Sequence, residues 1–459
     1  MKHIHLIGIG GTGLSAIALL LKERGYTVSG SDRTLSPLAR QLSAHGVTVY
    51  AGHDANNVLQ ADLVVRSSAI PDDNPEVLAA LQAGIPVLKR AEFLGQLMDG
   101  YQGIAIAGTH GKTTTTAMVA WTFTSLGQDP SYIIGGVAKN LGNNAHAGSG
   151  RNFVIEADEY DNMFLGLTPD VEVVCTLEHD HPDCFPTVES YKEAFIRFVH
   201  RLEPDGVLIT CTDDAGTRWL ASNHGRKDIR TLTYGTDAKA DYRAEDLAPN
   251  QRGGFDFTAL YHGEKLTTVR LQVPGAHNAL NALAALAVTH IQGLPVDQAA
   301  AALAEFSGTG RRFEVLGEAA GIVVVDDYAH HPTEVRATLS AARARYPGRR
   351  IWAVWQPHTY SRTVTLLDDF IAALQLADHV IVTEVYAARE HSQGFSSAVI
   401  VEAMTHPSAY FAPTLPSATQ YLLEQLQPGD VLLVLSAGDA DQISASVYAE
   451  LKSQEASHA

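Results

Sequence analysis

The most informative stretch of the sequence is GTHGKT, at residues 108–113. It follows the apolar run IAIA, which predicts a strand, and it leads into four consecutive threonines that open a helical pattern. Glycines let backbone N–H groups turn toward an anion, and a helix N-terminus adds partial positive charge. Lys112 could then reach the β- and γ-phosphates of a nucleotide, and the Thr113 hydroxyl could ligate magnesium. Because threonines are poor helix formers, a nucleotide site explains the stretch better than an ordinary turn with a solvated lysine.

A second glycine-rich loop, GIGGTG, lies near the start of the chain at residues 8–13, and Asp32 ends the next apolar run. This arrangement fits a dinucleotide-binding fingerprint, although GxGxxG alone is a weak signal. An NAD-dependent dehydrogenase is therefore one interpretation. One chain with two separate phosphate-binding loops more naturally binds two phosphorylated ligands.

Two further apolar runs end in side chains suited to a metal ion. Glu156 lies in FVIEADEYD, and His181 lies in LEHDHPD. A carboxylate and an imidazole at adjacent strand ends could complete a magnesium shell around phosphates. Taken alone, the same two residues are more simply a surface pair without a ligand.

An alanine-rich helix is predicted to begin at HNALN, where Asn278 and Asn281 are three residues apart and share one face. Each amide offers a donor and an acceptor, which suits the edge of an adenine ring. Asparagines at the start of a helix also act as caps, and without other information that is the simpler interpretation.

The elements that must position these residues form three α/β blocks. Short apolar runs alternate with helical patterns throughout, which is typical of βαβ units and parallel sheets. We expect domains at residues 1–103, 104–310 and 311–459, with Rossmann-like folds in the first and third. The second is expected to have a mainly parallel, P-loop-type sheet, with an antiparallel addition between residues 235 and 275. Polar motifs follow the strand ends, where open α/β sheets bind ligands.

Composition narrows the class of protein. The 459 residues carry 33 basic and 51 acidic side chains, for a net charge of −18. This balance argues against binding to nucleic acid or to anionic membranes, which needs clustered Lys and Arg. Three cysteines are too few for a disulfide framework, and no apolar run is long enough to span a bilayer. We expect a cytoplasmic protein, either a monomer or a homodimer.

The sequence also resembles a known family. Its shortened loop lacks the first glycine of the common P-loop, which would fall at Ile106, and this form is similar to that of the Mur ligases, ATP-dependent amide-forming enzymes of peptidoglycan synthesis. The resemblance extends over the whole chain, in the order HLIGIGGTGLSAIA, SGSD, AGTHGKTTTTAM, EADEYD, EHDHPD, HNALNALAA, GRRFE, DDYAHHPTE and QPHTYSRT. It implies that ATP and magnesium support the attachment of L-alanine to the lactyl carboxylate of UDP-N-acetylmuramate through an acyl phosphate.

The resemblance also implies a role for each motif, domain by domain. The UDP-sugar would lie on the first domain, at Gly8, Gly10, Gly11, Thr12, Gly13, Asp32, Ser67 and Ser68. ATP would contact Gly108, Thr109, His110, Gly111, Lys112, Thr113, Thr114, Asn278, Asn281, Arg312 and Asp327. Catalysis would depend on Lys112, Glu156 and His181, and magnesium would be held by Thr113, Glu156 and His181. The amino acid would contact Tyr328, His330, His331 and Arg362.

One position departs from a common form of the family, in which QPH is followed by a second arginine. This chain has Thr359 there, and Arg389 is a candidate replacement. Ser67 and Ser68 are equally well explained as turn serines. Three alternatives remain open: a recycling ligase that attaches a whole tripeptide to the same UDP-sugar, the dehydrogenase, and a regulator that binds ATP without catalysis. QPHTYSRT favours a single amino acid, and intact Lys112, Glu156 and His181 favour an enzyme.

Overall fold

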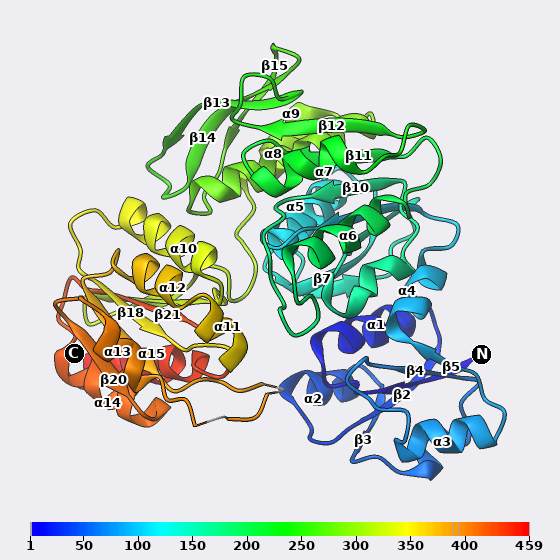
Figure 1. Ribbon diagram of the computed structural model, residues 1–459, viewed down its shortest axis with the longest axis horizontal. Coiled ribbons are helices and arrows are strands. Elements are labelled where there is room, and N and C mark those ends of the chain that lie inside the picture. Colours follow the sequence, from blue (N-terminus) through cyan, green and yellow to red (C-terminus); the bar gives the residue numbers. More distant parts are fainter. Residues whose placement is uncertain (1, 389, 393, 459) are drawn as a thin grey trace.

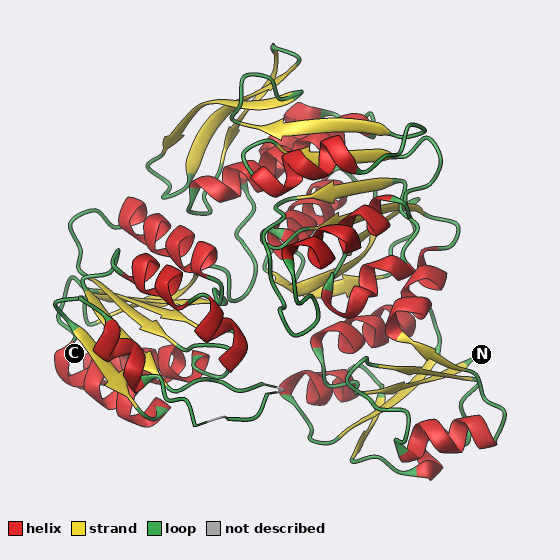
Figure 2. Ribbon diagram, viewed as in Figure 1, coloured by secondary structure: helices red, strands yellow, loops and turns green. Residues whose placement is uncertain are grey.

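The computed structural model describes residues 2–388, 390–392 and 394–458. Their strands form three separate sheets, of five, ten and six strands in chain order. The three units follow one another from blue to red in Figure 1, and Figure 2 shows helices on both faces of each sheet. The predicted three-domain α/β fold is therefore confirmed.

The first sheet is parallel, with the strand order β3-β2-β1-β4-β5. β2 and β3 are added on one side of β1, and β4 and β5 are added on its other side. This change of side opens a crevice at the carboxyl end of β1, where Rossmann-like folds bind ligands. The strands are β1 (His3–Ile7), β2 (Thr27–Asp32), β3 (Thr48–Ala51), β4 (Leu63–Arg66) and β5 (Val87–Lys89). The helices are α1 (Thr12–Glu23), α2 (Pro37–Ala44), η1 (Ala55–Val58), α3 (Pro75–Gln82) and α4 (Arg90–Met98).

The second sheet has the order β15-β14-β13-β12-β11-β10-β6-β9-β7-β8. Its strands are β6 (Gln102–Ala107), β7 (Ser131–Ala138), β8 (Asn143–His146), β9 (Asn152–Glu156), β10 (Val171–Val174), β11 (Val207–Cys211), β12 (Arg230–Gly235), β13 (Tyr242–Pro249), β14 (Phe255–Tyr261) and β15 (Glu264–Arg270). The helices are α5 (Lys112–Ser125), η2 (Tyr160–Gly166), α6 (Val188–Val199), α7 (Ala215–Asn223), α8 (Ala276–Ile291) and α9 (Val296–Ala304).

The antiparallel addition predicted for the second domain is present, and it is continuous with the parallel sheet. β13 pairs with β12 in parallel, and β14 and β15 then follow as antiparallel neighbours. The strand predicted over FVIEADEYD ends at Glu156 instead. Beyond it the chain turns into η2, where Asp161 and Asn162 have positive φ angles of 54° and 53° that a strand does not allow.

The third sheet has the order β16-β17-β21-β18-β19-β20, and only β16 runs antiparallel to its neighbour. Its strands are β16 (Glu314–Ala319), β17 (Ile322–Asp327), β18 (Ile351–Trp355), β19 (His379–Thr383), β20 (Ala409–Ala412) and β21 (Val431–Leu435). The helices are α10 (Pro332–Arg345), α11 (Tyr360–Thr365), α12 (Leu367–Leu374), α13 (Ala398–Ala403), α14 (Leu415–Gln425) and α15 (Asp441–His458). None of the described helices is both long and apolar enough to cross a membrane.

The domains join in two different ways. The first and second share one apolar core, in which Leu21 of α1 and Phe93 of α4 are buried in the same cluster as Phe164 of η2. Their backbones also meet, because a β-carbon added at Gly95 would collide with the carbonyl oxygen of Gly166. The third domain has its own apolar clusters, made wholly of residues beyond Arg312.

Candidate active site

The first glycine loop joins β1 to α1 at the crevice of the first sheet. Gly8 has a positive φ of 89°, and a β-carbon there would lie 3.1 Å from the Ser67 side chain. The amide of Gly10 donates to Asp32 Oδ2 at 2.9 Å, so the loop is tied to the ends of β2 and β4. The structure thus brings together the residues predicted for the UDP-sugar: Gly8, Gly10, Gly11, Thr12, Gly13, Asp32, Ser67 and Ser68.

A cation that sequence reasoning did not identify lies against this loop. The guanidinium of Arg90, the first residue of α4, occupies the space that a side chain at Gly13 would need. It also lies 3.5 Å from Asp158 Oδ2 of the second domain. Arg90 follows β5 at the far edge of the parallel sheet, and no local motif marks its approach to the loop.

The second loop joins β6 to α5 and requires its glycines. Gly108 and Gly111 have positive φ angles of 126° and 85°, and a β-carbon at Gly108 would lie 2.8 Å from the amide nitrogen of Thr176. The amide of His110 donates to Thr176 Oγ1 at 2.8 Å, and the Thr109 hydroxyl donates to the Glu178 carbonyl at 2.7 Å. The segment that follows β10 therefore holds the loop in place.

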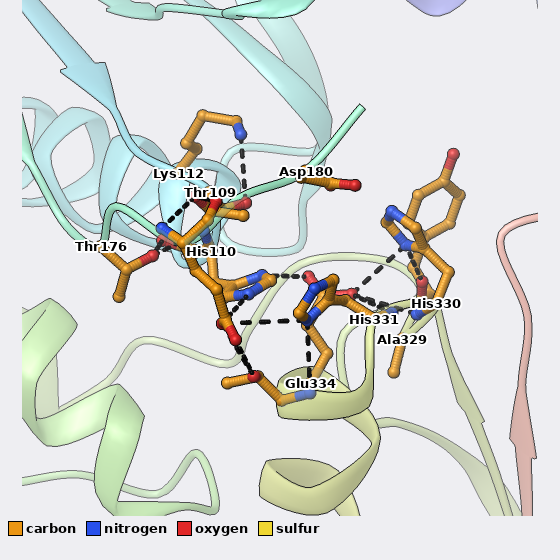
Figure 3. Close-up of polar contacts among 12 residues, drawn as sticks. Thr109, His110, Lys112, Thr176, Asp180, Ala329, His330, His331 and Glu334 are labelled. Carbon is orange, nitrogen blue, oxygen red and sulfur yellow. Dashed lines mark hydrogen bonds and ion pairs between the residues drawn. The ribbon is translucent and has the colours of Figure 1, made fainter. Parts of the chain in front are cut away.

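Lys112 is folded back onto its own loop (Figure 3). Its Nζ donates to the carbonyl of Gly108 at 2.5 Å and lies 2.9 Å from Glu159 Oε2. Burial alone would lower the pKa of Lys112, but Glu159 and Asp158 raise it above its ordinary value, so the ammonium is charged at neutral pH. Glu159 is almost fully buried, and nothing in the sequence distinguishes it from the other acidic residues of EADEYD.

Glu156 and His181 lie on either side of this loop. The prediction that they follow adjacent strands is wrong in detail, because β6 lies between β9 and β10 and carries the loop between them. Glu156 accepts from the Thr113 hydroxyl at 3.0 Å and from the Gly135 amide at 2.6 Å. Burial raises its pKa, so a cation beside it would stabilise the carboxylate.

The donor set fits a magnesium ion. Hydroxyl and carboxylate oxygens at Thr113 and Glu156 are the ligands that Mg²⁺ prefers. His181 Nδ1 is buried and has no hydrogen-bond partner among the described residues, so it is available as a nitrogen ligand. His181 Nε2 lies 3.6 Å from Glu159 Oε1, which places the imidazole beside the partner of Lys112.

A cavity of about 340 Å³ lies between this loop and the third domain, beside the contact of His110 with Glu334. Asn278 and Asn281 line it from α8, and Asn281 Nδ2 donates to Asn278 Oδ1 at 3.0 Å. Its other lining residues include His110, Gly111, Thr113, Thr114, Cys175, Tyr234, Arg312, Asp327, Thr333 and Glu334. Most of the residues predicted for ATP therefore border one space, which two domains enclose together.

Arg312 and Asp327 reach the cavity from the junction with the third domain. Arg312 lies 3.5 Å from Glu334 Oε1. Asp327 accepts from the amides of Phe313 and Ala329, each at 2.7 Å, and burial raises its pKa to about 6. In this arrangement Asp327 supports the junction, and its predicted contact with ribose stays a prediction.

Four ionisable side chains, His110, Glu178, His331 and Glu334, meet between the second and third domains (Figure 3). His110 Nε2 lies 3.1 Å from Glu178 and its Nδ1 lies 3.2 Å from Glu334. The rings of His110 and His331 are 4.8 Å apart. Burial alone would lower the pKa of His110, but its hydrogen bonds to Glu178 and Glu334 raise it to about 9. We call these four residues the interdomain histidine cluster.

The residues predicted for the amino acid lie on two loops of the third domain. Tyr328, His330 and His331 follow β17, and His331 caps α10 through its contact with the Thr333 amide at 3.3 Å. Arg362 lies in α11 and is only 3% exposed.

Arg362 is already paired with a carboxylate of the protein. Its Nε and Nη2 donate to Asp180 Oδ1 of the second domain at 3.0 and 2.8 Å. Arg362 is therefore occupied by a carboxylate oxygen of the protein, and its predicted contact with the amino acid stays a prediction. Thr359 is buried with a positive φ of 64°, and its candidate replacement Arg389 lies outside the described residues.

The comparisons with known proteins agree with these motifs. Residues 3–102 match the Mur ligase family catalytic domain, residues 106–289 match the Mur ligase middle domain, and residues 311–438 match the Mur ligase glutamate ligase domain. The chain belongs to the Mur ligase family. The resemblance stated from the sequence is thereby confirmed, and the ATP dependence of the family extends to this chain.

Individual Mur ligases resemble this chain over nearly its full length. It is 41% identical over 457 residues to the UDP-N-acetylmuramate–L-alanine ligase of Alkaliphilus metalliredigens (strain QYMF), with 98% of each chain covered. Among solved structures, the UDP-N-acetylmuramate–alanine ligase of Thermotoga maritima has a TM-score of 0.84 at 30% identity, covering 99% of this chain and 100% of that chain. The murein peptide ligase of Psychrobacter arcticus has a TM-score of 0.72 at 29% identity, covering 98% and 99%.

Proposed function

We propose that this Mur ligase uses ATP to attach L-alanine to the lactyl carboxylate of UDP-N-acetylmuramate, a step of peptidoglycan precursor synthesis. The observation that carries the proposal is the full-length identity of 41% to a relative of that name. The fold agrees better with the alanine ligase, at a TM-score of 0.84, than with the peptide ligase, at 0.72. Attachment of a whole tripeptide is therefore the less supported alternative.

The reaction proceeds in two steps because a carboxylate is a poor electrophile. A lactyl carboxylate oxygen attacks the γ-phosphorus of ATP, the bond from that phosphorus to the β,γ-bridging oxygen breaks, and ADP leaves. The ammonium group of alanine releases a proton to solvent, and the neutral amine attacks the acyl carbon of the resulting acyl phosphate. A second proton is released to solvent as the amide forms, and inorganic phosphate leaves with the C–O bonding pair. The protein contributes mainly by positioning three ligands and by matching the charge that develops during phosphoryl transfer.

The two glycine loops divide the phosphorylated ligands between them. The loop at residues 8–13 offers backbone N–H groups and the start of α1 to the diphosphate of the UDP-sugar, with Arg90 beside it. The loop at residues 108–113 holds the phosphates of ATP, whose adenine lies in the cavity near Asn278 and Asn281. Lys112 then exchanges its contact with Glu159 for an oxygen of the transferred phosphoryl group.

Thr113, Glu156 and His181 would hold magnesium at the phosphates. When bound, the ion offsets negative charge on the phosphoryl oxygens. Replacing Glu156 with Gln removes the charged ligand, so the magnesium concentration for half-maximal activity should rise by about tenfold or more. A titration that overlays that of the parent protein would remove Glu156 from the site.

Alanine enters on the third-domain side, near Arg362 and the loop of Tyr328, His330 and His331. The protein is expected to act as a monomer or as a homodimer. ATP and UDP-sugars are cytoplasmic metabolites, and the proposed reaction belongs to that compartment.

The direct test is release of ADP from ATP with UDP-N-acetylmuramate and a panel of amines: L-alanine, glycine, L-serine and the tripeptide. We expect ADP release to require the UDP-sugar and to be fastest with L-alanine. Lys112→Ala should lower turnover by about a hundredfold or more, by analogy with the loss of one preorganised donor. Lys89→Ala removes an exposed lysine near the first loop and serves as the control. A preference for the tripeptide would establish the alternative.

A further inference from the structure

The ion pair between Asp180 and Arg362 is unusual in its position. Both side chains are nearly inaccessible, at 5% and 4% exposed, and they come from different domains, 182 residues apart in sequence. Removing two charges from water is costly, so a buried pair of this kind contributes little to stability by itself. Its position, next to His181 and between the second and third domains, suggests another use.

The Nε–Nη2 edge of the Arg362 guanidinium is not free for a substrate. Its Nε and Nη2 edge is occupied by Asp180 Oδ1, and its Nη1 donates to His358 Nδ1 at 3.1 Å. A substrate carboxylate can form two parallel hydrogen bonds with this edge only if Asp180 moves away. Displacing Asp180 without giving it a new cation would separate a buried carboxylate from its guanidinium and leave it the His181 amide at 2.7 Å and the His181 imidazole at 3.7 Å, which is unfavourable.

An α-amino acid solves this problem because it is a zwitterion. We propose that Asp180 binds the ammonium group of the incoming amino acid while Arg362 binds its carboxylate, so that the internal ion pair opens into two pairs. The exchange introduces no net charge and leaves neither side chain unpaired. This inference rests on the proposed amino-acid ligation, and it names Asp180 as a specificity-determining residue of that site.

The direction of Asp180 agrees with this role. Its side chain extends from the segment after β10 toward the loop that carries His330 (Figure 3). Oδ1 faces Arg362, whereas Oδ2 lies 3.7 Å from His181 Nε2. An ammonium group at Oδ2 would therefore lie on the side of His181, where the acyl phosphate is expected. Binding by Asp180 thus brings the amine toward the carbon that it attacks.

The proposed contacts require a ligand that carries both an ammonium group and a carboxylate. Alanine, glycine and serine all carry both charges, so the pair selects α-amino acids as a class and leaves the choice among side chains to other residues. Propionate has the carboxylate and the methyl group of alanine but lacks the ammonium group. It can use Arg362 but not Asp180, which makes it a probe that separates the two contacts.

The test compares alanine and propionate in the parent protein, in Asp180→Asn and in Asp183→Asn. Asp183 is an exposed carboxylate three positions away, so its replacement is a matched control. ADP release gives the KM of alanine, and competition against alanine gives the Ki of propionate. We expect Asp180→Asn to raise the KM of alanine at least tenfold while the Ki of propionate stays constant or falls, because Arg362 loses a competitor. Asp183→Asn should change neither constant by more than about twofold.

Parallel weakening of alanine and propionate in Asp180→Asn would overturn the proposal, because Asp180 would then only maintain the shape of the site. Unchanged constants would overturn it as well. If Asp180→Asn fails to fold, the parent protein alone tests the proposal. Propionate should bind to it at least thirtyfold more weakly than alanine. Equal binding of the two ligands would exclude an ammonium contact. A parent protein that releases no ADP with alanine and UDP-N-acetylmuramate would instead contradict the proposed function.

Discussion

The second domain meets the first through a shared apolar core, whereas it meets the third through ionisable side chains. At the first interface, α4 and η2 approach so closely that only glycine fits at positions 95 and 166. The other interface holds the interdomain histidine cluster, of which His110 and Glu334 line the cavity, and the Asp180–Arg362 pair. Packed cores resist small displacements, but hydrogen bonds and ion pairs can be exchanged for contacts with a ligand. The comparison therefore indicates a fixed interface on one side and an adjustable one on the other.

The largest effect is expected at the fixed interface. Gly166→Ala would place a β-carbon against the carbonyl oxygen of Ala91, and a backbone atom cannot rotate away. We expect a loss of about 3 kcal/mol in the free energy of unfolding, at the upper end for overpacked sites. Gly310→Ala is the control, because the nearest atom to its added β-carbon is 3.6 Å away. Urea unfolding of both variants measures the difference, and equal stabilities would mean that the first interface is not tightly packed.

A smaller and pH-dependent effect is expected at the adjustable interface. The pKa of His110 is raised to about 9 from an ordinary value of 6.5, so its contribution to stability is complete below pH 6.5 and is lost as the pH rises through 9. His110→Gln should remove about 1–2 kcal/mol at pH 6 and nearly nothing at pH 10. Thermal unfolding of parent and variant across this range measures the difference. A constant difference between the two proteins would show that the charge of His110 does not link the domains.

The smallest effect is expected for the hydroxyl of Thr333, which donates to Glu178 Oε2 at 2.8 Å across the adjustable interface. The Glu178 side chain is 43% exposed, and water can replace the bond. A double-mutant cycle of Thr333→Val and Glu178→Gln should give a coupling energy of about 0.5 kcal/mol. A coupling above about 2 kcal/mol would mean that this interface is as rigid as the first.

Much of this arrangement could be predicted from the sequence. Alternating apolar runs indicated three α/β sheets, and GIGGTG and GTHGKT indicated the loops at their strand ends, because these signals lie within single elements. The contacts of Lys112 with Glu159 and of Asp180 with Arg362 could not be predicted in this way. They join residues on different elements or domains, and nothing in the local spacing distinguishes Glu159 or Asp180 from the acidic residues around them.

The contact of α4 with η2 could not be predicted either, because it also joins residues of different elements. Gly95 lies inside α4, where glycine is a poor helix former, so the sequence offers no reason for a glycine there. The reason is the close approach of the Gly166 carbonyl oxygen, which only the folded structure shows. The order of β9, β6 and β10 is another case. Sequence order suggested that Glu156 and His181 follow neighbouring strands, but the crossover places the loop of Lys112 between them.

The short connection between the second and third domains has a consequence for affinity. Gly308, Arg311 and Phe313 all have positive φ angles, so the chain turns sharply between α9 and β16 and keeps the two domains close. The facing surfaces of two domains joined by a short linker have an effective concentration of about millimolar for each other. Contacts far too weak to hold two separate proteins together are then sufficient to close the cavity. We expect the same weakness to let the cavity reopen, so that bound ligands can diffuse away.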